Sequence, residues 1–338
     1  MAVIQVVSNQ PGAGKTSLIG ALLDHLYQQG RRAGYYRPFS PTPQNDPDVE
    51  FIAQQLLAGA DAPPVPPPQP LPAAGPPEPA LRDAITSLVA AAGTVLVEGP
   101  DLDHQEESGP ALASRVAALL DSKVVLLVRY AGGLRAGDVA TLAAPLGDRL
   151  AGVVINSCPP HRRREVQQEL VEALRQRGLP ALGAIPDDRY MLAVTVRQIA
   201  EHLGGRWVQE PVNTDAYVDR FLIGGNIMDS GPNYFGRYQN QAVITRAERP
   251  DIQMASLACA TRCLVLTGGA PPTEYVRVEA AARQVPLILV DADTISTAEA
   301  LAGLQEQASA RSRQKVRRFR QLMDEHLDLP ALEALLGG

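Results

Sequence analysis

The N-terminal residues join an apolar strand to a glycine-rich loop and then to a helix. The strand pattern covers Ala2 to Val7, and a helical pattern runs from Thr16 to Gln29. The loop between them contains Gly12-Ala13-Gly14-Lys15-Thr16-Ser17. Glycines let backbone amides turn inward as an anion nest, the helix N-terminus adds positive potential, and Lys and Thr reach phosphate oxygens and Mg²⁺. The loop therefore predicts a parallel α/β sheet that carries a phosphate site, although the common leading glycine is replaced by Asn9.

The first half of the chain alternates short aliphatic segments with longer helical patterns, which is typical of a parallel sheet with crossover helices. The expected strands are Ala2 to Val7, Arg32 to Arg37, Thr94 to Glu98, Val124 to Arg129, Gly152 to Asn156 and Ala181 to Ile185. The expected helices are Thr16 to Gln29, Val49 to Ala58, Ala80 to Ala92, Ala111 to Leu120, Ala136 to Pro145 and His161 to Arg177.

The chain is long enough for two domains, because 338 residues exceed one ordinary core. We predict a P-loop nucleotide-binding domain at 1–190, with a proline-rich surface loop at 62–79. A linker at 191–210, a smaller α/β domain at 211–308 and a charged helical tail at 309–338 follow.

The second region repeats the α/β pattern. Its expected strands are Arg206 to Gln209, Gln241 to Thr245, Cys263 to Leu266 and Pro286 to Val290. Its expected helices are Thr195 to Leu203, Asp215 to Phe221, Pro250 to Ala260, Thr273 to Ala282 and Thr294 to Ala308. The tail begins with the basic residues Arg311, Arg313, Lys315, Arg317, Arg318 and Arg320. We interpret them as a solvated helix face at a subunit contact, or as phosphate contacts.

Charge and hydropathy narrow the partners. A net charge of -6 gives no global field for nucleic acid or anionic lipid. No apolar run approaches the ~20 residues of a membrane span, and Met1 to Ser8 lacks a signal pattern. We therefore expect a cytoplasmic protein that binds small molecules or a protein partner, with no nucleic acid and no membrane. The pair Cys259 and Cys263 predicts small apolar packing, with metal binding as the alternative.

Polar side chains mark the ends of the predicted strands. Glu98 ends a central strand, where ligands bind in open α/β sheets, and could hold Mg²⁺ directly or through water; the alternative is a strand-end residue facing solvent. Asp48, at a helix start, either caps the helix or contacts the metal. Asn156 either reads an adenine edge or is a turn residue. With Thr16, Asp48 and Glu98 as metal ligands, the expected cofactors are ATP and Mg²⁺.

With these residues in place, the chain resembles dethiobiotin synthetase. It resembles more closely the N-terminal part of long phosphate acetyltransferases, a P-loop AAA_26 domain followed by a DRTGG domain. The segments that carry the resemblance are Ser8 to Ser17, Tyr36-Arg37-Pro38, Val97-Glu98-Gly99, Gly152 to Asn156, Leu182 to Pro186, Thr195-Val196, Ile244 to Asp251 and Leu266 to Gly269. The resemblance implies a homo-oligomer and adds Pro186 to the cofactor-binding residues.

The sequence departs from these families at two positions. Arg37 stands where dethiobiotin synthetase has a substrate-contacting lysine, and a planar guanidinium does not replace an ammonium. The Asp-Arg pair of the DRTGG domain is Glu248-Arg249. The sequence also lacks an acetyltransferase catalytic domain, so we expect no acetyl transfer by this polypeptide.

Two functions stay open. In the first, the protein is a regulatory or sensor ATPase, and its second domain binds a small effector such as an adenine nucleotide. The anion site of that domain is then Arg246, Arg249, Thr267, Gly268 and Gly269. In the second, the protein is an ATP-dependent ligase of the dethiobiotin or cobyrinic acid diamide synthetase type, acting on a carboxylate or carbamate. Its catalytic residues are Lys15, Thr16, Arg37 and Glu98. A partitioning-type ATPase is a minor third hypothesis, because its signature lysine would fall at Gln10.

Overall fold

The chain folds into two compact units, and the second is inserted into the first. The computed structural model describes residues 2–72, 78–102, 108–225 and 231–337. The first unit comprises Met1–Asp188 and Ala310–Gly338, and the second comprises Arg189–Ser309. The chain therefore leaves the first unit once, builds the second, and returns.

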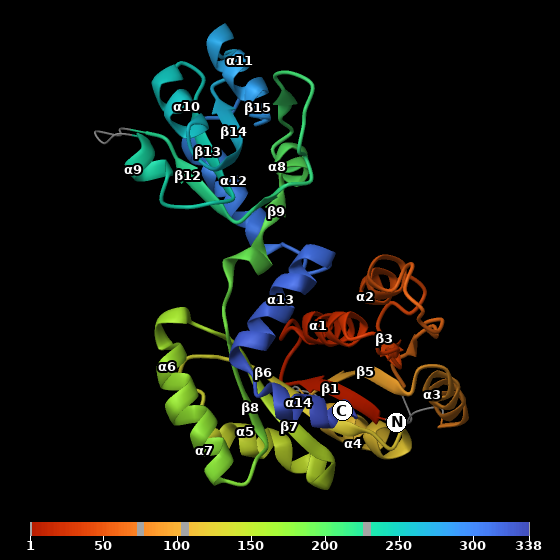
Figure 1. Ribbon diagram of the computed structural model, residues 1–338. Coiled ribbons are helices and arrows are strands. Elements are labelled where there is room, and N and C mark those ends of the chain that lie inside the picture. Colours follow the sequence, from red (N-terminus) through yellow and green to blue (C-terminus); the bar gives the residue numbers. More distant parts are fainter. Residues whose placement is uncertain (1, 73–77, 103–107, 226–230, 338) are drawn as a thin grey trace. The chain divides into compact units, whose positions relative to one another are not determined.

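The first unit is built on a six-stranded parallel sheet of order β2-β5-β1-β6-β7-β8 (Figure 1). Its strands are β1 (Ala2–Ser8), β2 (Ala33–Tyr36), β5 (Thr94–Asp101), β6 (Lys123–Arg129), β7 (Leu150–Cys158) and β8 (Ala181–Pro186). A short parallel pair, β3 (Phe39–Ser40) and β4 (Gln69–Pro70), lies outside this sheet. The parallel-sheet fold expected from the sequence is confirmed.

Helices connect these strands. The first unit contains α1 (Lys15–Gln28), α2 (Pro47–Glu50), η1 (Phe51–Leu56), α3 (Glu78–Ala92), α4 (Ser108–Leu119), α5 (Ala136–Ala143), η2 (Ala144–Arg149), η3 (Pro160–Arg162), α6 (Arg163–Glu165), η4 (Val166–Val171), α7 (Glu172–Gln176), α13 (Arg313–His326) and α14 (Leu329–Leu335). The segments η1 and η4 are π-helical, so the helices expected at 49–58 and 161–177 are real but each contains a stretch of wider winding.

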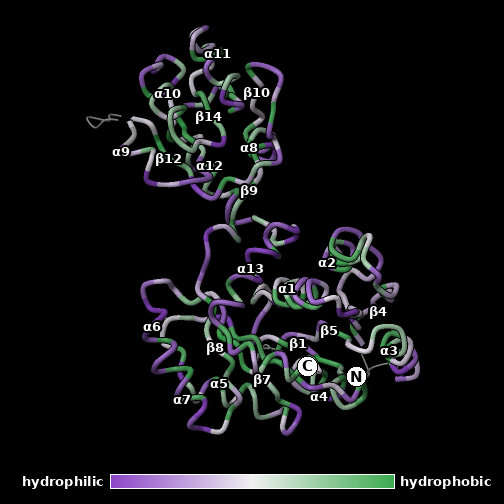
Figure 2. The backbone as a smooth tube through the Cα atoms, viewed as in Figure 1, coloured by the Kyte–Doolittle hydropathy of each residue, from purple (hydrophilic) through white to green (hydrophobic). Residues whose placement is uncertain are grey.

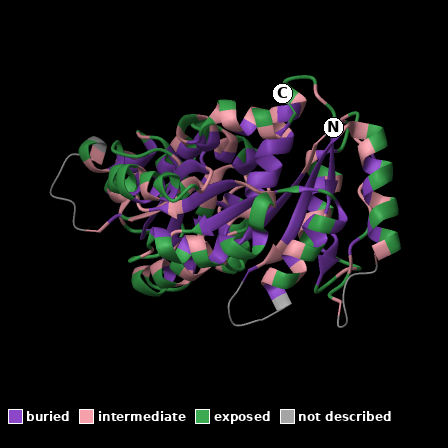
Figure 3. Cartoon of the chain, turned by 90° about the horizontal axis from the view of Figure 1, so that it is seen from below, coloured by how far each residue is buried: buried purple, intermediate pink, exposed green. Residues whose placement is uncertain are grey.

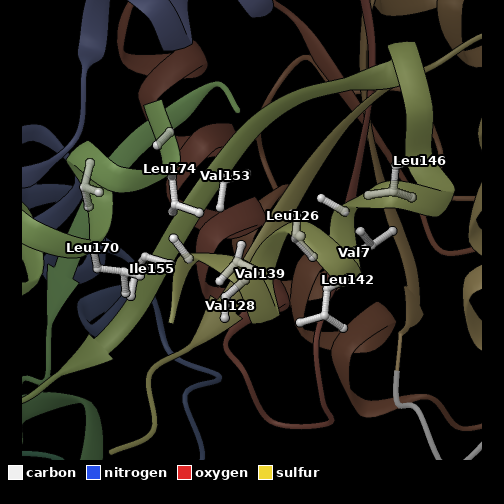
Figure 4. Packing of buried hydrophobic residues seen from close by; sticks show 14 of the residues in the cluster. Val7, Leu126, Val128, Val139, Leu142, Leu146, Val153, Ile155, Leu170 and Leu174 are labelled. Carbon is white, nitrogen blue, oxygen red and sulfur yellow. The ribbon is translucent and has the colours of Figure 1, made fainter. Parts of the chain in front are cut away.

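The strands of this sheet are largely hydrophobic (Figure 2) and buried (Figure 3), because helices cover both of its faces. Against one face, α4, α5, η4 and α7 pack on side chains of β6 and β7, such as Leu126 and Val153 (Figure 4). The helix α3 covers β2 and β5 beside them. The helix α1 packs on β1, β5 and β2.

The returning segment belongs to the first unit. Helix α13 lies along α1 and buries Val316, Phe319 and Leu322 (Figure 1). After it, Leu327 bridges Gly183 on the edge strand β8, where a Cβ on Gly183 would meet the carbonyl oxygen of His326 at 2.4 Å. The prediction of a separate charged tail at 309–338 is therefore wrong, because the apolar side of this amphipathic helix is buried within the first unit. The expected solvated face is present in part, since Arg313 and Arg317 are exposed.

The second unit is a five-stranded sheet of order β10-β15-β14-β13-β12. Its strands are β10 (Arg206–Trp207), β12 (Arg220–Ile223), β13 (Gln241–Arg246), β14 (Thr261–Thr267) and β15 (Leu287–Leu289), and only β10 pairs in antiparallel fashion. A separate antiparallel pair joins β9 (Val194–Thr195) to β11 (Tyr217–Val218). Its helices are η5 (Arg189–Leu192), α8 (Val196–His202), α9 (Gly231–Phe235), α10 (Pro250–Leu257), α11 (Glu274–Ala282) and α12 (Thr294–Glu306). Helices α8 and α12 cover one face, and α9, α10 and α11 the other.

Three segments differ from what the sequence predicts. The helix expected at Asp215 to Phe221 is wrong, since these residues contribute to β11 and β12. The interval 191–210, expected to be a linker, contains β9, α8 and β10. The proline-rich segment is not wholly a surface loop, because Pro63 and Pro68 are buried and β4 pairs with β3; its residues 73–77 lie outside the described part of the chain.

Among the described residues, no helix is long and apolar enough to cross a membrane. The cysteines Cys158, Cys259 and Cys263 are free thiols, and two of them are buried in the cores.

Candidate functional site

The loop between β1 and α1 has the backbone that its glycines suggest. Gly12 and Gly14 have φ of 68° and 104°, and Gly14 caps α1 in the left-handed region. No side chain caps the N-terminus of α1, and its first turn carries no acidic residue. The positive end of this helix is therefore available to an anion.

Three side-chain contacts hold the loop against neighbouring strands. The Asn9 Oδ1 accepts from the backbone amide of Arg129 at 2.8 Å, and the Arg129 guanidinium donates to the Gly12 carbonyl at 2.9 Å. The Asn156 Nδ2 donates to the Ala13 carbonyl at 2.8 Å. Asn9 is not among the residues with positive φ, so this position does not need the glycine of the common motif. Its amide instead anchors the loop to β6.

Lys15 lies at the start of α1 and points to the end of β5. Its Nζ donates to the Ser8 Oγ at 3.0 Å and to the carboxylate of Asp101. Ser8 also donates to Asp101, so Ser8, Lys15 and Asp101 all contact one another. Asp101 was not among the residues predicted from the sequence, although its place three residues after Glu98, on a strand that ends at this edge, was a usable signal.

The predicted metal ligands meet beside Lys15. The Thr16 Oγ1 donates to Glu98 Oε1 at 3.1 Å, and the Tyr35 hydroxyl donates to Glu98 Oε2 at 2.8 Å. Arg37 lies among three carboxylates, at 2.9 Å from Glu98, 2.7 Å from Asp48 and 3.2 Å from Asp46. Arg37 is therefore the counter-ion of a partly buried acidic cluster.

Burial sets the ionisation of this cluster. The side chain of Glu98 is 3% exposed, and this desolvation raises its pKa although Arg37 lowers it. Burial alone would lower the pKa of Arg37, but Glu98, Tyr35 and the two aspartates raise it overall. Arg37 thus stays charged and shields carboxylates that would otherwise repel one another.

The structure excludes one of the two roles considered for Asp48. Asp46 caps α2, because its Oδ1 accepts from the backbone amides of Asp48 and Val49 at 2.9 and 3.0 Å. Asp48 is therefore not the cap. Its Oδ2 faces Arg37, and its Oδ1 accepts from the Nε of Arg311 at 2.8 Å.

The side chains predicted to bind the metal carry the kind of ligand atoms that Mg²⁺ prefers. Thr16, Asp48 and Glu98 supply a hydroxyl and carboxylates, the hard oxygen ligands that Mg²⁺ prefers. Within the described ranges, no group of three or more His, Cys, Asp or Glu side chains is arranged to hold a metal by itself. A magnesium ion here would therefore need waters and phosphate oxygens to complete its shell, as is usual for this ion.

Two predicted nucleotide contacts lie further along the sheet. Asn156, near the end of β7, is buried against the loop, so the contact that the structure shows is with Ala13 and not with an open base pocket. Pro186 ends β8, the edge strand beyond β7. Base contact by either residue stays a prediction.

The predicted anion site of the second unit has a different character. The amides of Gly268 and Gly269 donate to the carbonyls of Ala292 and Val290 at 3.1 and 3.0 Å. The two backbone amides expected to form an anion nest at Thr267-Gly268-Gly269 therefore already donate to carbonyls of the same unit. The Thr267 Oγ1 lies 2.9 Å from the Thr294 Oγ1.

The two arginines of that predicted site differ in their contacts. Arg249 forms a two-point ion pair with Asp251, at 3.0 and 2.8 Å. Arg246 ends β13 and has an exposed side chain. Of the predicted pair, Arg246 is thus the guanidinium that the structure leaves open to solvent.

The first unit, with its strand, glycine loop, helix and parallel sheet, is a P-loop fold. The chain belongs to the family of AAA domains designated AAA_26, whose model matches residues 3–194. Residues 198–304 match the DRTGG domain. These matches name neither dethiobiotin synthetase nor phosphate acetyltransferase, so that finer resemblance stays a prediction.

Several solved structures are similar to parts of the chain. The cell division protein MinD of Aquifex aeolicus shares 15% identity at a TM-score of 0.41, covering 57% of this chain and 84% of its own. The signal recognition particle receptor FtsY of Elizabethkingia anophelis, in complex with GDP, shares 16% at 0.39, covering 54% and 56%. The CBS and DRTGG domains of the regulatory region of Clostridium perfringens pyrophosphatase, complexed with the activator diadenosine tetraphosphate, share 11% at 0.30, covering 42% and 72%.

Proposed function

We propose that the first unit binds ATP together with Mg²⁺, and that the protein is a regulatory ATPase whose second unit binds a small effector. The observation that carries the first part is the uncapped, acid-free N-terminus of α1 beside Lys15, Thr16 and Glu98. Phosphates are the anions that such a helix start and lysine accommodate.

Each residue of the site has a role in this proposal. Lys15 would exchange Asp101 for a phosphate oxygen, since both are anions within reach of one flexible side chain. Thr16, Glu98 and Asp48 would hold Mg²⁺, and the bound metal would neutralise phosphate charge. Arg37 would keep the remaining carboxylate charge balanced while the metal is absent.

The acidic surroundings of Arg37 favour regulation over ligase chemistry. A ligase of the dethiobiotin type would use Arg37 to orient a substrate carboxylate. The guanidinium is only 18% exposed and contacts Asp46, Asp48 and Glu98, so a fourth carboxylate would have to displace one of them. The ligase hypothesis therefore requires Arg37 to release one of its carboxylates, whereas the exchange of Asp101 for phosphate at Lys15 leaves the contacts of Arg37 in place.

For the second unit, we propose an effector site at the carboxyl ends of β13 and β14. This edge is where ligands bind in open parallel sheets, and Arg246 contributes an exposed cation there. An adenine nucleotide is our first candidate. Thermal-shift measurements with adenine nucleotides test it in Lys15→Ala protein, where shifts report the second unit, and Arg246→Ala should abolish them.

Isothermal titration with ATP and Mg²⁺ tests the main proposal. We expect measurable binding by the unmodified protein and at least about a tenfold loss in Lys15→Ala, because one charge-assisted contact to phosphate disappears. Lys123→Ala is the matched control, since Lys123 is an exposed lysine at the opposite end of β6. Equal affinities in all three proteins would overturn the proposal. An ADP-release assay that one carboxylic acid strongly stimulates would favour the ligase instead.

A further inference from the structure

The chain that returns from the second unit meets the acidic cluster of the first. Ser309 is the last residue of the second unit, and Arg311 lies two positions later. Its Nε donates to Asp48 Oδ1 at 2.8 Å. This contact lies within the first unit, yet the backbone that carries it leads directly to the last helix of the second unit, α12.

Both oxygens of Asp48 face a guanidinium. Arg37 lies at 2.7 Å from Oδ2, and Arg311 at 2.8 Å from Oδ1. A divalent cation at Asp48 would lie next to both positive groups, and like charges at such distances repel. Metal binding at Asp48 therefore favours the departure of one arginine.

Arg311 is the more exposed of the two arginines. Its side chain is 39% exposed and precedes the first turn of α13, whereas that of Arg37 is 18% exposed and also contacts Asp46 and Glu98.

The helix itself stays anchored when Arg311 moves. Arg313 donates to the carbonyls of Gln55 and Ala58, which follow Asp48 in the chain. Val316 packs on Gly20 of α1, where a Cβ would lie 3.0 Å from it. Arg311 can therefore exchange without undocking α13, which separates its role from that of an anchor.

We propose that Arg311 competes with Mg²⁺ for Asp48, so that its release links the P-loop site to the second unit through the Ser309–Arg311 segment. This inference rests on the proposed binding of nucleotide and Mg²⁺. Linkage is reciprocal, so an effector that draws this segment from Asp48 strengthens metal binding, and metal binding in turn favours that effector.

The test is the Mg²⁺ concentration that half-saturates binding of a fluorescent ADP analogue to the full chain. We expect Arg311→Gln to lower this concentration about threefold, the range of one exposed ion pair. Arg311→Lys, which keeps the charge, should resemble the unmodified protein. Arg313→Gln is the matched control, because it weakens the anchor of the same segment without touching Asp48, and should leave the Mg²⁺ dependence unchanged.

A second readout follows the segment directly. Hydrogen exchange of residues 309–313 should rise when Mg²⁺ and ADP are added to the unmodified protein. An Arg311→Gln protein that binds ADP with unchanged or weaker Mg²⁺ dependence would overturn the competition alone. Failure of every variant to bind nucleotide would overturn the proposed function, and the inference with it.

Discussion

The two sheets of this protein have similar carboxyl edges and different charges on them. In the first unit, α1 starts with no acidic residue and no side-chain cap, and Lys15 lies beside it. In the second unit, the helices that follow β13 and β14 carry Asp251 and Glu274 in their first turns. Acids at a helix N-terminus take the place that an anionic ligand would occupy.

The difference shows that the parallel-sheet fold alone does not create a phosphate site. The glycine loop after β1 leads into the uncapped N-terminus of α1, whereas Gly268 and Gly269 after β14 donate their amides to backbone carbonyls. A ligand of the second unit must therefore rely more on side chains such as Arg246 than on backbone amides. The predictions below test this contrast.

The largest expected effect is at Gly14. A Cβ there would lie 2.7 Å from Asn156 Nδ2, and φ is 104°, so Gly14→Ala strains the loop and displaces Asn156. We expect about a tenfold or larger loss of ATP affinity by isothermal titration. Gly12→Ala serves as the control, because a Cβ there meets no atom within 4 Å and only the backbone strain remains. Equal losses in the two variants would contradict the role given to Asn156.

An intermediate effect concerns stability. Lys315 on α13 is buried, and burial lowers its pKa from 10.5 to about 8. Between these values the folded unit binds fewer protons than the unfolded chain, so its stability should rise as pH increases from about 8 to 10.5.

Urea unfolding at several pH values checks this expectation. Lys315→Met should remove this rise of stability with pH. The second unit should not respond, since Lys315 belongs to the first. The exposed Lys123→Met is the control. A rise that persists in Lys315→Met would show that another group causes it.

The smallest expected effect is at the carboxyl edge of the sheet in the second unit. The side-chain contact with Arg249 lowers the pKa of Asp251, so this ion pair persists at neutral pH. Asp251→Asn should free Arg249 and strengthen pyrophosphate binding about twofold, measured in a Lys15→Ala background to silence the first edge. Glu274→Gln changes a neighbouring helix start without touching Arg249, so an equal gain there would mean that net charge alone is responsible.

Local patterns predicted much of the fold. Consecutive aliphatic residues identified most strands of the two sheets, because a strand covered on both faces is apolar at successive positions. The segment Asp215 to Phe221 failed because its strands β11 and β12 are short and are fixed by pairing with Thr195 and Gln241, which no local pattern reveals. The docking of α13 failed for a similar reason, since its partner α1 lies at the other end of the chain.

The residues of the site were likewise predicted only in part. Lys15, Thr16, Glu98 and Asp48 come together as the strand ends suggested. Asp101 was not predicted, although its place on the strand of Glu98 was a local signal, and Arg311 was not predicted because its partner Asp48 lies far away in the chain. Asn156 and the Gly268-Gly269 turn were predicted to contact ligands. The structure shows their hydrogen bonds with Ala13, Ala292 and Val290, and base contact by Asn156 stays a prediction.

Hydrogen exchange with and without ATP and Mg²⁺ tests the contrast between the two edges most directly. We predict slower exchange at residues 9–18 and 94–101 of the first unit. Lys15→Ala should abolish this protection, whereas protection at 246–252 and 267–275, the proposed effector edge of the second unit, should not depend on Lys15. Protection confined to the second edge, or unchanged exchange at the glycine loop under saturating nucleotide, would contradict the claim that the start of α1 is the phosphate site.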